Sequence, residues 1–69
     1  MNDELKELDA LLEYLINHNK DHAGEITELA GKALDMGKAS VHSELMRGVE
    51  TLNASNEHLM SALKGLRGK

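Results

Sequence analysis

The chain has 69 residues, a formal net charge of −4, and no cysteine, proline, tryptophan or phenylalanine. This length predicts one domain over residues 1–69, and the lack of cysteine excludes disulfides, thiolate nucleophiles and thiolate metal ligands. The acidic charge and the single aromatic residue, Tyr14, disfavour nucleic-acid binding. No segment is apolar for long enough to predict a signal peptide or a membrane span. So small a chain without disulfides fits the cytoplasm, which is the location we expect.

The first predicted element is a long helix over residues 3–36. Its apolar residues recur at alternating steps of three and four, which places them on one helical stripe, the a/d seam of a heptad repeat. The seam consists of Leu5, Leu8, Leu12, Leu15, Asn19, His22, Ile26, Leu29, Ala33 and Met36. Polar residues 17–21 leave an alternative, a three-helix bundle with a break near 18–21. We favour the continuous helix because a loop would reset the heptad phase, which persists here.

A short break separates this helix from a second one, predicted over residues 40–67. Gly37 suits the left-handed position that follows a helix, and Ser40 is a suitable N-cap for the next one. The second seam is His42, Leu45, Val49, Leu52, Asn56, Leu59, Leu63 and Leu66. So short a connection forces the helices to run antiparallel, and the predicted fold is an all-α helical hairpin.

The register of the hairpin follows from the position of the turn. Folding the chain about residues 37–38 pairs residues whose numbers add up to about 75, so Ile26 meets Val49 and Leu12 meets Leu63. The same rule brings Asn19 to Asn56. Two polar interruptions of the seams therefore coincide in space, which supports the hairpin.

Apolar residues also widen both stripes beyond the two seams. Those beside the seams are Leu11, Ile16, Ala23, Ala30, Val41, Met46, Met60 and Ala62. A stripe of this width is typical of a bundle, and small chains without disulfides often gain stability by oligomerising. We therefore expect two hairpins to form a four-helix bundle as a homodimer, or the stripe to accept a helix of another protein.

The two ends of the chain carry opposite charge. Carboxylates crowd the first turns, and Lys64 and Arg67 make the last turns basic. Each charge suits the dipole of its own helix end. Taken singly, we interpret them as a solvated acidic face and a solvated basic end.

The polar centre is the candidate functional site. His18 and His22 are four residues apart, so both imidazoles can face one point, as nitrogen ligands of zinc, nickel or copper do. Glu25 can add an oxygen ligand, and His58 lies opposite His18 by the register rule. These four residues are the predicted metal site.

A structural interpretation of the same layer needs no metal. Asparagines at a positions fix register and oligomeric state in helical bundles, at some cost in stability. The sequence contains no phosphate-binding loop, nucleophile elbow or Glu-x-x-His pair, so catalysis is not predicted. The favoured function is a non-enzymatic helical module that self-associates or binds a partner helix, and the alternative is divalent-metal binding.

The stretch His18-Asn19-Lys20-Asp21-His22-Ala23-Gly24-Glu25 resembles a small helical domain of prokaryotes. In that domain a leucine-rich opening runs into a His-Asn-x-x-His-Ala-x-Glu motif, and a second amphipathic helix follows. The resemblance extends from Leu8 to Leu63 and implies an association with nickel or cobalt handling, with His18, His22 and Glu25 as metal ligands. Gly24 departs from what is expected inside a helix.

Overall fold

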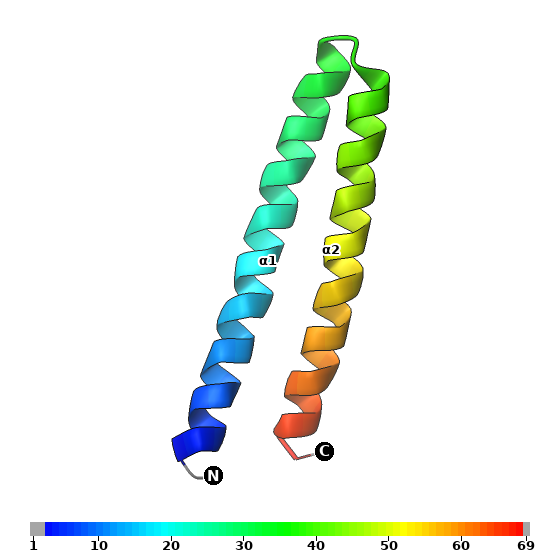
Figure 1. Cartoon of the computed structure of the whole chain (residues 1–69). Coiled ribbons are helices and arrows are strands. Elements are labelled where there is room, and N and C mark those ends of the chain that lie inside the picture. Colours follow the sequence, from blue (N-terminus) through cyan, green and yellow to red (C-terminus); the bar gives the residue numbers. More distant parts are fainter. Residues whose placement is uncertain (1–2, 69) are drawn as a thin grey trace.

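Two helices make up the part of the chain that the structure describes, and they run antiparallel along their whole length (Figure 1). The computed structural model describes residues 3–68, in which α1 spans Asp3–Asp35 and α2 spans Ala39–Leu66. Because α1 continues unbroken through residues 17–21, the predicted long helix is confirmed and the three-helix alternative is wrong. The predicted bounds differ from the observed ones by a single residue, within the ordinary uncertainty of helix ends.

The turn is a Schellman motif, which satisfies the last carbonyls of α1. The amide of Lys38 donates to the carbonyl of Ala33 at 2.8 Å, and that of Gly37 donates to Leu34 at 3.0 Å. Gly37 has φ of 76°, a conformation that glycine adopts without a steric cost, as predicted. Ser40, in contrast, is not the N-cap. Helix α2 begins at Ala39, one residue before the predicted start. Its N-cap is Lys38, which makes no side-chain capping hydrogen bond.

The seam of α2 is the predicted one, since all of its residues are buried or half-buried. In α1, every second residue of the observed seam lies one position after the predicted one. The residues that α1 turns toward α2 are Asp9, Leu12, Ile16, Asn19, Ala23, Ile26, Ala30 and Ala33. Leu8, Leu15 and Leu29 were predicted in the seam but are 46%, 44% and 53% exposed. The prediction was wrong for this half of the α1 seam.

Small side chains and polar contacts explain the rotation of α1. Ala23, Ala30 and Ala33 are buried, with Ala30 fully inaccessible, so α2 packs closely against the loop-proximal half of α1. Nδ1 of His42 lies 2.9 Å from the carbonyl oxygen of Ala30. A leucine at position 30 would hold the helices further apart and break this contact.

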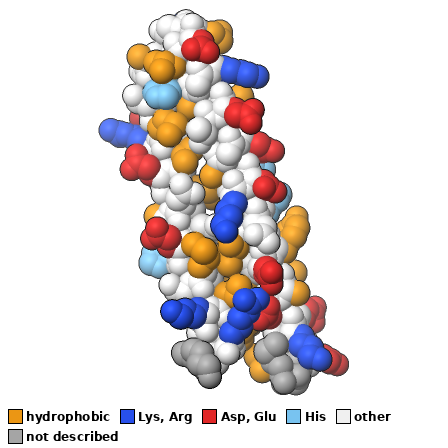
Figure 2. All heavy atoms as spheres, turned by 180° about the vertical axis from the view of Figure 1, so that it is seen from behind, with side chains coloured by type: hydrophobic (Ala, Val, Ile, Leu, Met, Phe, Trp, Pro, Cys, Tyr) orange, Lys and Arg blue, Asp and Glu red, His pale blue; other side chains and the backbone are white. Residues whose placement is uncertain are grey.

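The hydrophobic core is thin. The buried apolar residues are Ile16, Ala23, Ala30, Ala33, Val49 and Leu63. Within residues 3–68 no large side chain is fully buried. Figure 2 shows hydrophobic side chains in short groups along the line between the helices, with charged side chains on both sides. A single hairpin therefore leaves many of its large apolar side chains partly in water.

Neither helix of the described chain has an apolar stretch long enough to cross a membrane.

Candidate functional site

A pair of asparagines forms the polar layer at the middle of the hairpin. Nδ2 of Asn19 donates to Oδ1 of Asn56 at 3.2 Å, which confirms the predicted register. Nδ2 of Asn56 donates in turn to the carbonyl oxygen of Ile16 at 3.1 Å. Asn56 is only 4% exposed, so these bonds replace the water that its amide loses on folding. These hydrogen bonds link the two helices of one chain in a defined register.

His42 repeats this contact two heptads away. Its ring reaches the carbonyl of Ala30, just as Asn56 reaches the carbonyl of Ile16. The two side chains are fourteen positions apart on α2, and the two carbonyls are fourteen positions apart on α1. Because a carbonyl can only accept, Nδ1 of His42 carries the proton. Two polar side chains of α2 are therefore bonded to the backbone of α1, and between them they hold the helices in one register.

His18 and His22 lie together on the outside of α1. Their Nε2 atoms are 2.8 Å apart, and the two rings meet edge to face. Nδ1 of His22 lies 3.2 Å from Oε1 of Glu25, and the ring of Tyr14 stacks on that of His18 with centroids 5.5 Å apart. The carboxylate favours a proton on Nδ1 of His22, which leaves its Nε2 lone pair directed at His18. Nε2 of His18 then donates to this lone pair, so the two nitrogens are hydrogen-bonded to each other.

The four residues of the predicted metal site are not gathered within one chain. His18 and His22 converge, but Glu25 contacts the ring nitrogen of His22 that faces away from His18. His58 lies on α2 and makes no hydrogen bond or ion pair with residues 3–68. Within the described range no three His, Asp or Glu side chains are arranged to hold one ion. Within one chain only His18 and His22 lie together, and Glu25 contacts the other ring nitrogen of His22.

A cluster of charges joins the two helices at the open end of the hairpin. The guanidinium of Arg67 donates from Nε and Nη2 to the carboxylate of Asp9 at 2.9 and 3.0 Å, and from Nη2 to Glu13 at 2.9 Å. From the sequence, the acidic first turns, which include Asp9 and Glu13, and the basic last turns were interpreted as separately solvated. For Asp9, Glu13 and Arg67 that interpretation was wrong. Asp9 and Arg67 lie level in the hairpin register, so a bidentate pair forms where each helix would otherwise present an unpaired charge.

The pairing of Arg67 with Asp9 makes the stability of the hairpin vary with pH in the acid range. The hydrogen bonds and positive charge of Arg67 hold the pKa of Asp9 below the ordinary value, and Asp9 in turn raises the pKa of Arg67. A lowered folded-state pKa stabilises the fold above the unfolded-state pKa of about 3.9, and this contribution disappears as the pH falls through the folded-state value. We expect Asp9→Asn to melt at a lower temperature than wild type at pH 7 and at the same temperature at pH 2.

Thermal melts followed by circular dichroism at the two pH values measure this difference. Asp21→Asn, an exposed carboxylate of the same helix, is the matched control and should leave the melting temperature at pH 7 unchanged. A deficit of Asp9→Asn that persists at pH 2 would show that the variant acts through packing and not through the ion pair.

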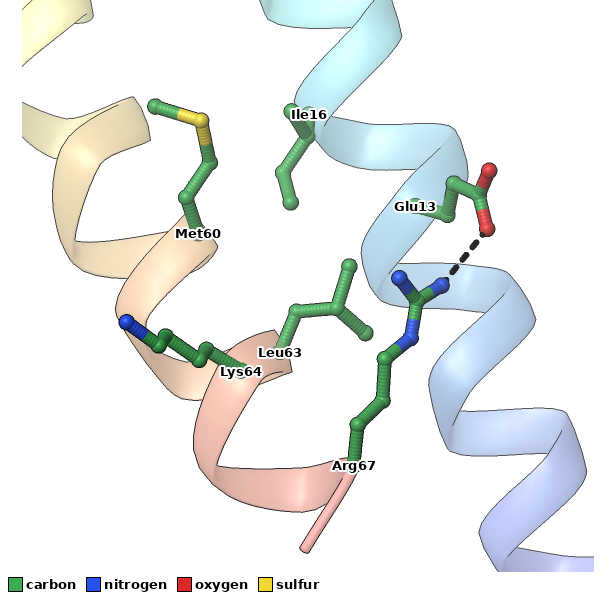
Figure 3. Close-up of a pocket in the computed structure, with 6 residues that line it drawn as sticks. All are labelled: Glu13, Ile16, Met60, Leu63, Lys64 and Arg67. Carbon is green, nitrogen blue, oxygen red and sulfur yellow. Dashed lines mark hydrogen bonds and ion pairs between the residues drawn. The ribbon is translucent and has the colours of Figure 1, made fainter. Parts of the chain in front are cut away.

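A shallow groove lies beside this cluster. It has a volume of about 360 Å³ and is lined by Glu13, Ile16, Met60, Leu63, Lys64 and Arg67. Figure 3 shows Ile16 and Leu63 between the helices, with Arg67 reaching across to Glu13. The groove is open to solvent, and its floor is the hairpin seam itself.

The opposite side of the hairpin carries an extended apolar face. The residue that precedes each a-type seam residue lies on this side in both helices, because equivalent positions of an antiparallel pair lie on the same face. On α1 these residues form the leucine row: Leu8, Leu15, His22, Leu29 and Met36. On α2 they form the small row: Val41, Gly48, Ser55 and Ala62. All are exposed, and none is Lys, Arg, Asp or Glu.

Half-buried residues fill the space between the two rows. They are Leu12, Ile26, Leu45, Leu52, Leu59 and Leu66. Each lies beside its row in helical order, so the part that is still exposed opens toward the same side. We call the two rows and these residues together the apolar face.

The sequence was compared with known protein families, curated proteins and solved structures. A family model described as a domain of unknown function (DUF8180) matches residues 8–66. The chain therefore belongs to this family. No curated protein and no solved structure was found to match.

Proposed function

We propose that this member of the DUF8180 family is a self-associating structural module without catalytic activity, in which two hairpins pack through their apolar faces into a four-helix bundle. The observation that carries the proposal is the exposed leucine row, which lies on the same side of the hairpin as the small row. Monomeric proteins seldom expose a large contiguous apolar surface unless it binds something.

The area that the chain exposes supports a second copy as the partner. Its accessible surface is 5202 Å², whereas a compact monomer of 7.6 kDa exposes about 4,300 Å². The excess of about 900 Å² is close to the ~800 Å² that each partner contributes to a standard protein interface. The radius of gyration, 15.8 Å, also exceeds the ~11 Å of a compact domain of this length. One hairpin packed on another would remove this excess.

The distribution of charge favours the same interface. Charged residues make up 29% of the chain, yet the nine positions of the two rows contain none of them. The groove side, in contrast, carries the Glu13–Arg67 pair and Lys64. A face without charge can be buried without leaving an unpaired ion, so the apolar face is the side that a partner hairpin covers.

Substitution of Leu15 by Glu tests the proposal. The variant should weaken association at least tenfold, equivalent to about 1.4 kcal/mol, because a charge would be buried without a partner. Thermal unfolding measured over a range of concentrations reports this, since the melting temperature of a dimer rises with concentration. Tyr14→Glu is the matched control, because Tyr14 is 61% exposed and points away from the seam. Equal effects of both variants, or a wild-type melting temperature independent of concentration, would contradict the proposal.

A second candidate function is the binding of nickel, cobalt or zinc. The specific observation that favours it is the convergence of the His18 and His22 Nε2 atoms. Two nitrogens at 2.0–2.1 Å from a tetrahedral zinc lie about 3.3 Å apart, so the observed pair would need to open by only ~0.5 Å. Titration calorimetry of the wild type and His22→Ala with each ion tests this function. The absence of bound metal at neutral pH would leave the pair as a surface contact.

A further inference from the structure

We infer that His18 and His22 of one chain and His58 of a second copy form a three-histidine site for a borderline divalent cation, at the interface between the two chains. The inference rests on the proposed homodimer. It names the second subunit's contribution, which a single hairpin does not provide.

The pair of histidines has the donor chemistry of such a site but lacks a ligand. Nitrogen ligands suit zinc, nickel and copper, and three histidines with a water or substrate in the fourth position form a familiar zinc centre. His22 is oriented by Glu25 through its other ring nitrogen, at 3.2 Å, as metal-bound histidines commonly are. No third ligand comes from residues 3–68 of the same chain. The missing ligand must come from elsewhere.

The shapes of the two rows indicate how the copies are oriented. A twofold axis parallel to the helices places the leucine row of each chain over the small row of the other. The hairpin register then sets Leu29 level with Gly48 of the partner subunit, and Leu15 level with Ala62 of the partner subunit. Large residues facing small ones allow close packing.

Charges at the edge of the same interface support this orientation. Lys32 and Glu44 are placed alike relative to the two rows, each three residues after a row position. Residues whose numbers add up to about 75 lie level in the hairpin, and a twofold axis parallel to the helices keeps these levels between the chains. Because 32 and 44 add up to 76, Lys32 lies level with Glu44 of the partner subunit. Opposite charges thus meet at the rim. Among residues 3–68 of its own chain Glu44 makes only a long contact, 3.9 Å, with Arg47.

The same arithmetic brings the third histidine into place. His18 and His58 each lie three residues after a row position, and their numbers also add up to 76. The twofold axis therefore sets His58 of the partner subunit beside the His18–His22 pair. His58 is exposed and has no hydrogen bond within the described residues, so its ring is free to turn toward an ion. Each dimer would contain two such sites.

Titration calorimetry with zinc chloride tests the composition of the site. The wild type should bind one ion per chain, and His22→Ala and His58→Ala should each bind at least 100-fold more weakly. Glu57→Gln, which alters the neighbour of His58, is the control and should bind like the wild type. Wild-type affinity in His58→Ala would overturn the inference, because His18 and His22 would then suffice. The absence of zinc binding by the wild type would also overturn it.

Mixing the two defective variants shows whether the ligands come from different chains. A mixed dimer of His22→Ala and His58→Ala contains one complete site, so after subunit exchange the mixture should recover about a quarter of the wild-type capacity. No recovery would overturn the inference. Sedimentation of the same samples separates the two proposals. A dimer that binds no zinc contradicts only the site, and a monomeric wild type contradicts the homodimer as well.

Discussion

Asn19→Leu is expected to lower the free energy of unfolding by about 1–3 kcal/mol, although it adds apolar surface to the seam. The change leaves Oδ1 of Asn56 buried without its donor, and this unmet hydrogen bond costs more than the leucine gains. Asn56→Leu removes the bond to the Ile16 carbonyl as well and should be destabilising too. Urea unfolding followed by circular dichroism measures both effects.

The double variant is the informative comparison. With both amides replaced by leucine no polar group is left unpaired, so stability should return to the wild-type value or exceed it. Two single effects that simply add would show that Asn19 and Asn56 are not in contact, contrary to the register described above. The double variant should also loosen the choice of register or oligomeric state, which a broader range of masses in sedimentation would reveal.

Ala30→Leu is expected to destabilise the hairpin by about 1–3 kcal/mol, because position 30 is fully inaccessible and has no room for three more carbons. The larger side chain would separate the helices at this point and break the contact of His42 with the Ala30 carbonyl. Ala10→Leu, at an exposed position of the same helix, is the control and should change the unfolding midpoint little. Equal midpoints for the two variants would contradict the close packing of the alanines.

The fold was predictable because its signals are local and repeated. Gly37 marked the turn, the second seam kept its period from His42 to Leu66, and the position of the turn set the contact between Asn19 and Asn56. Each of these depends on helix geometry and on the length of one loop, and both can be obtained from the sequence alone.

The seam of α1 was harder to predict because this helix has two apolar stripes. The more hydrophobic one, with Leu8, Leu15 and Leu29, was assigned to the hairpin, but the structure places it outside. Hydrophobicity favours leucine over alanine in a seam. Here the close approach of the helices and the bonds to two backbone carbonyls favour alanine, and no periodicity of hydrophobic residues reports those contacts.

The candidate site was predictable only in part. The spacing of His18 and His22 showed that their rings could meet, and the structure brings them to 2.8 Å. The outward position of Glu25 depends on its rotamer, which a sequence pattern does not fix. The Asp9–Arg67 pair could have been found from the register rule, had charged residues been paired as the asparagines were.

Sedimentation equilibrium of the wild-type chain, with a chelator present so that no metal contributes, tests the homodimer most directly. Packing through the apolar face predicts a mass of twice 7.6 kDa across the micromolar range, for the wild type and for Tyr14→Glu, and a mass near 7.6 kDa for Leu15→Glu. A wild-type mass of 7.6 kDa throughout that range would contradict it, and would leave the apolar face for a helix of another protein.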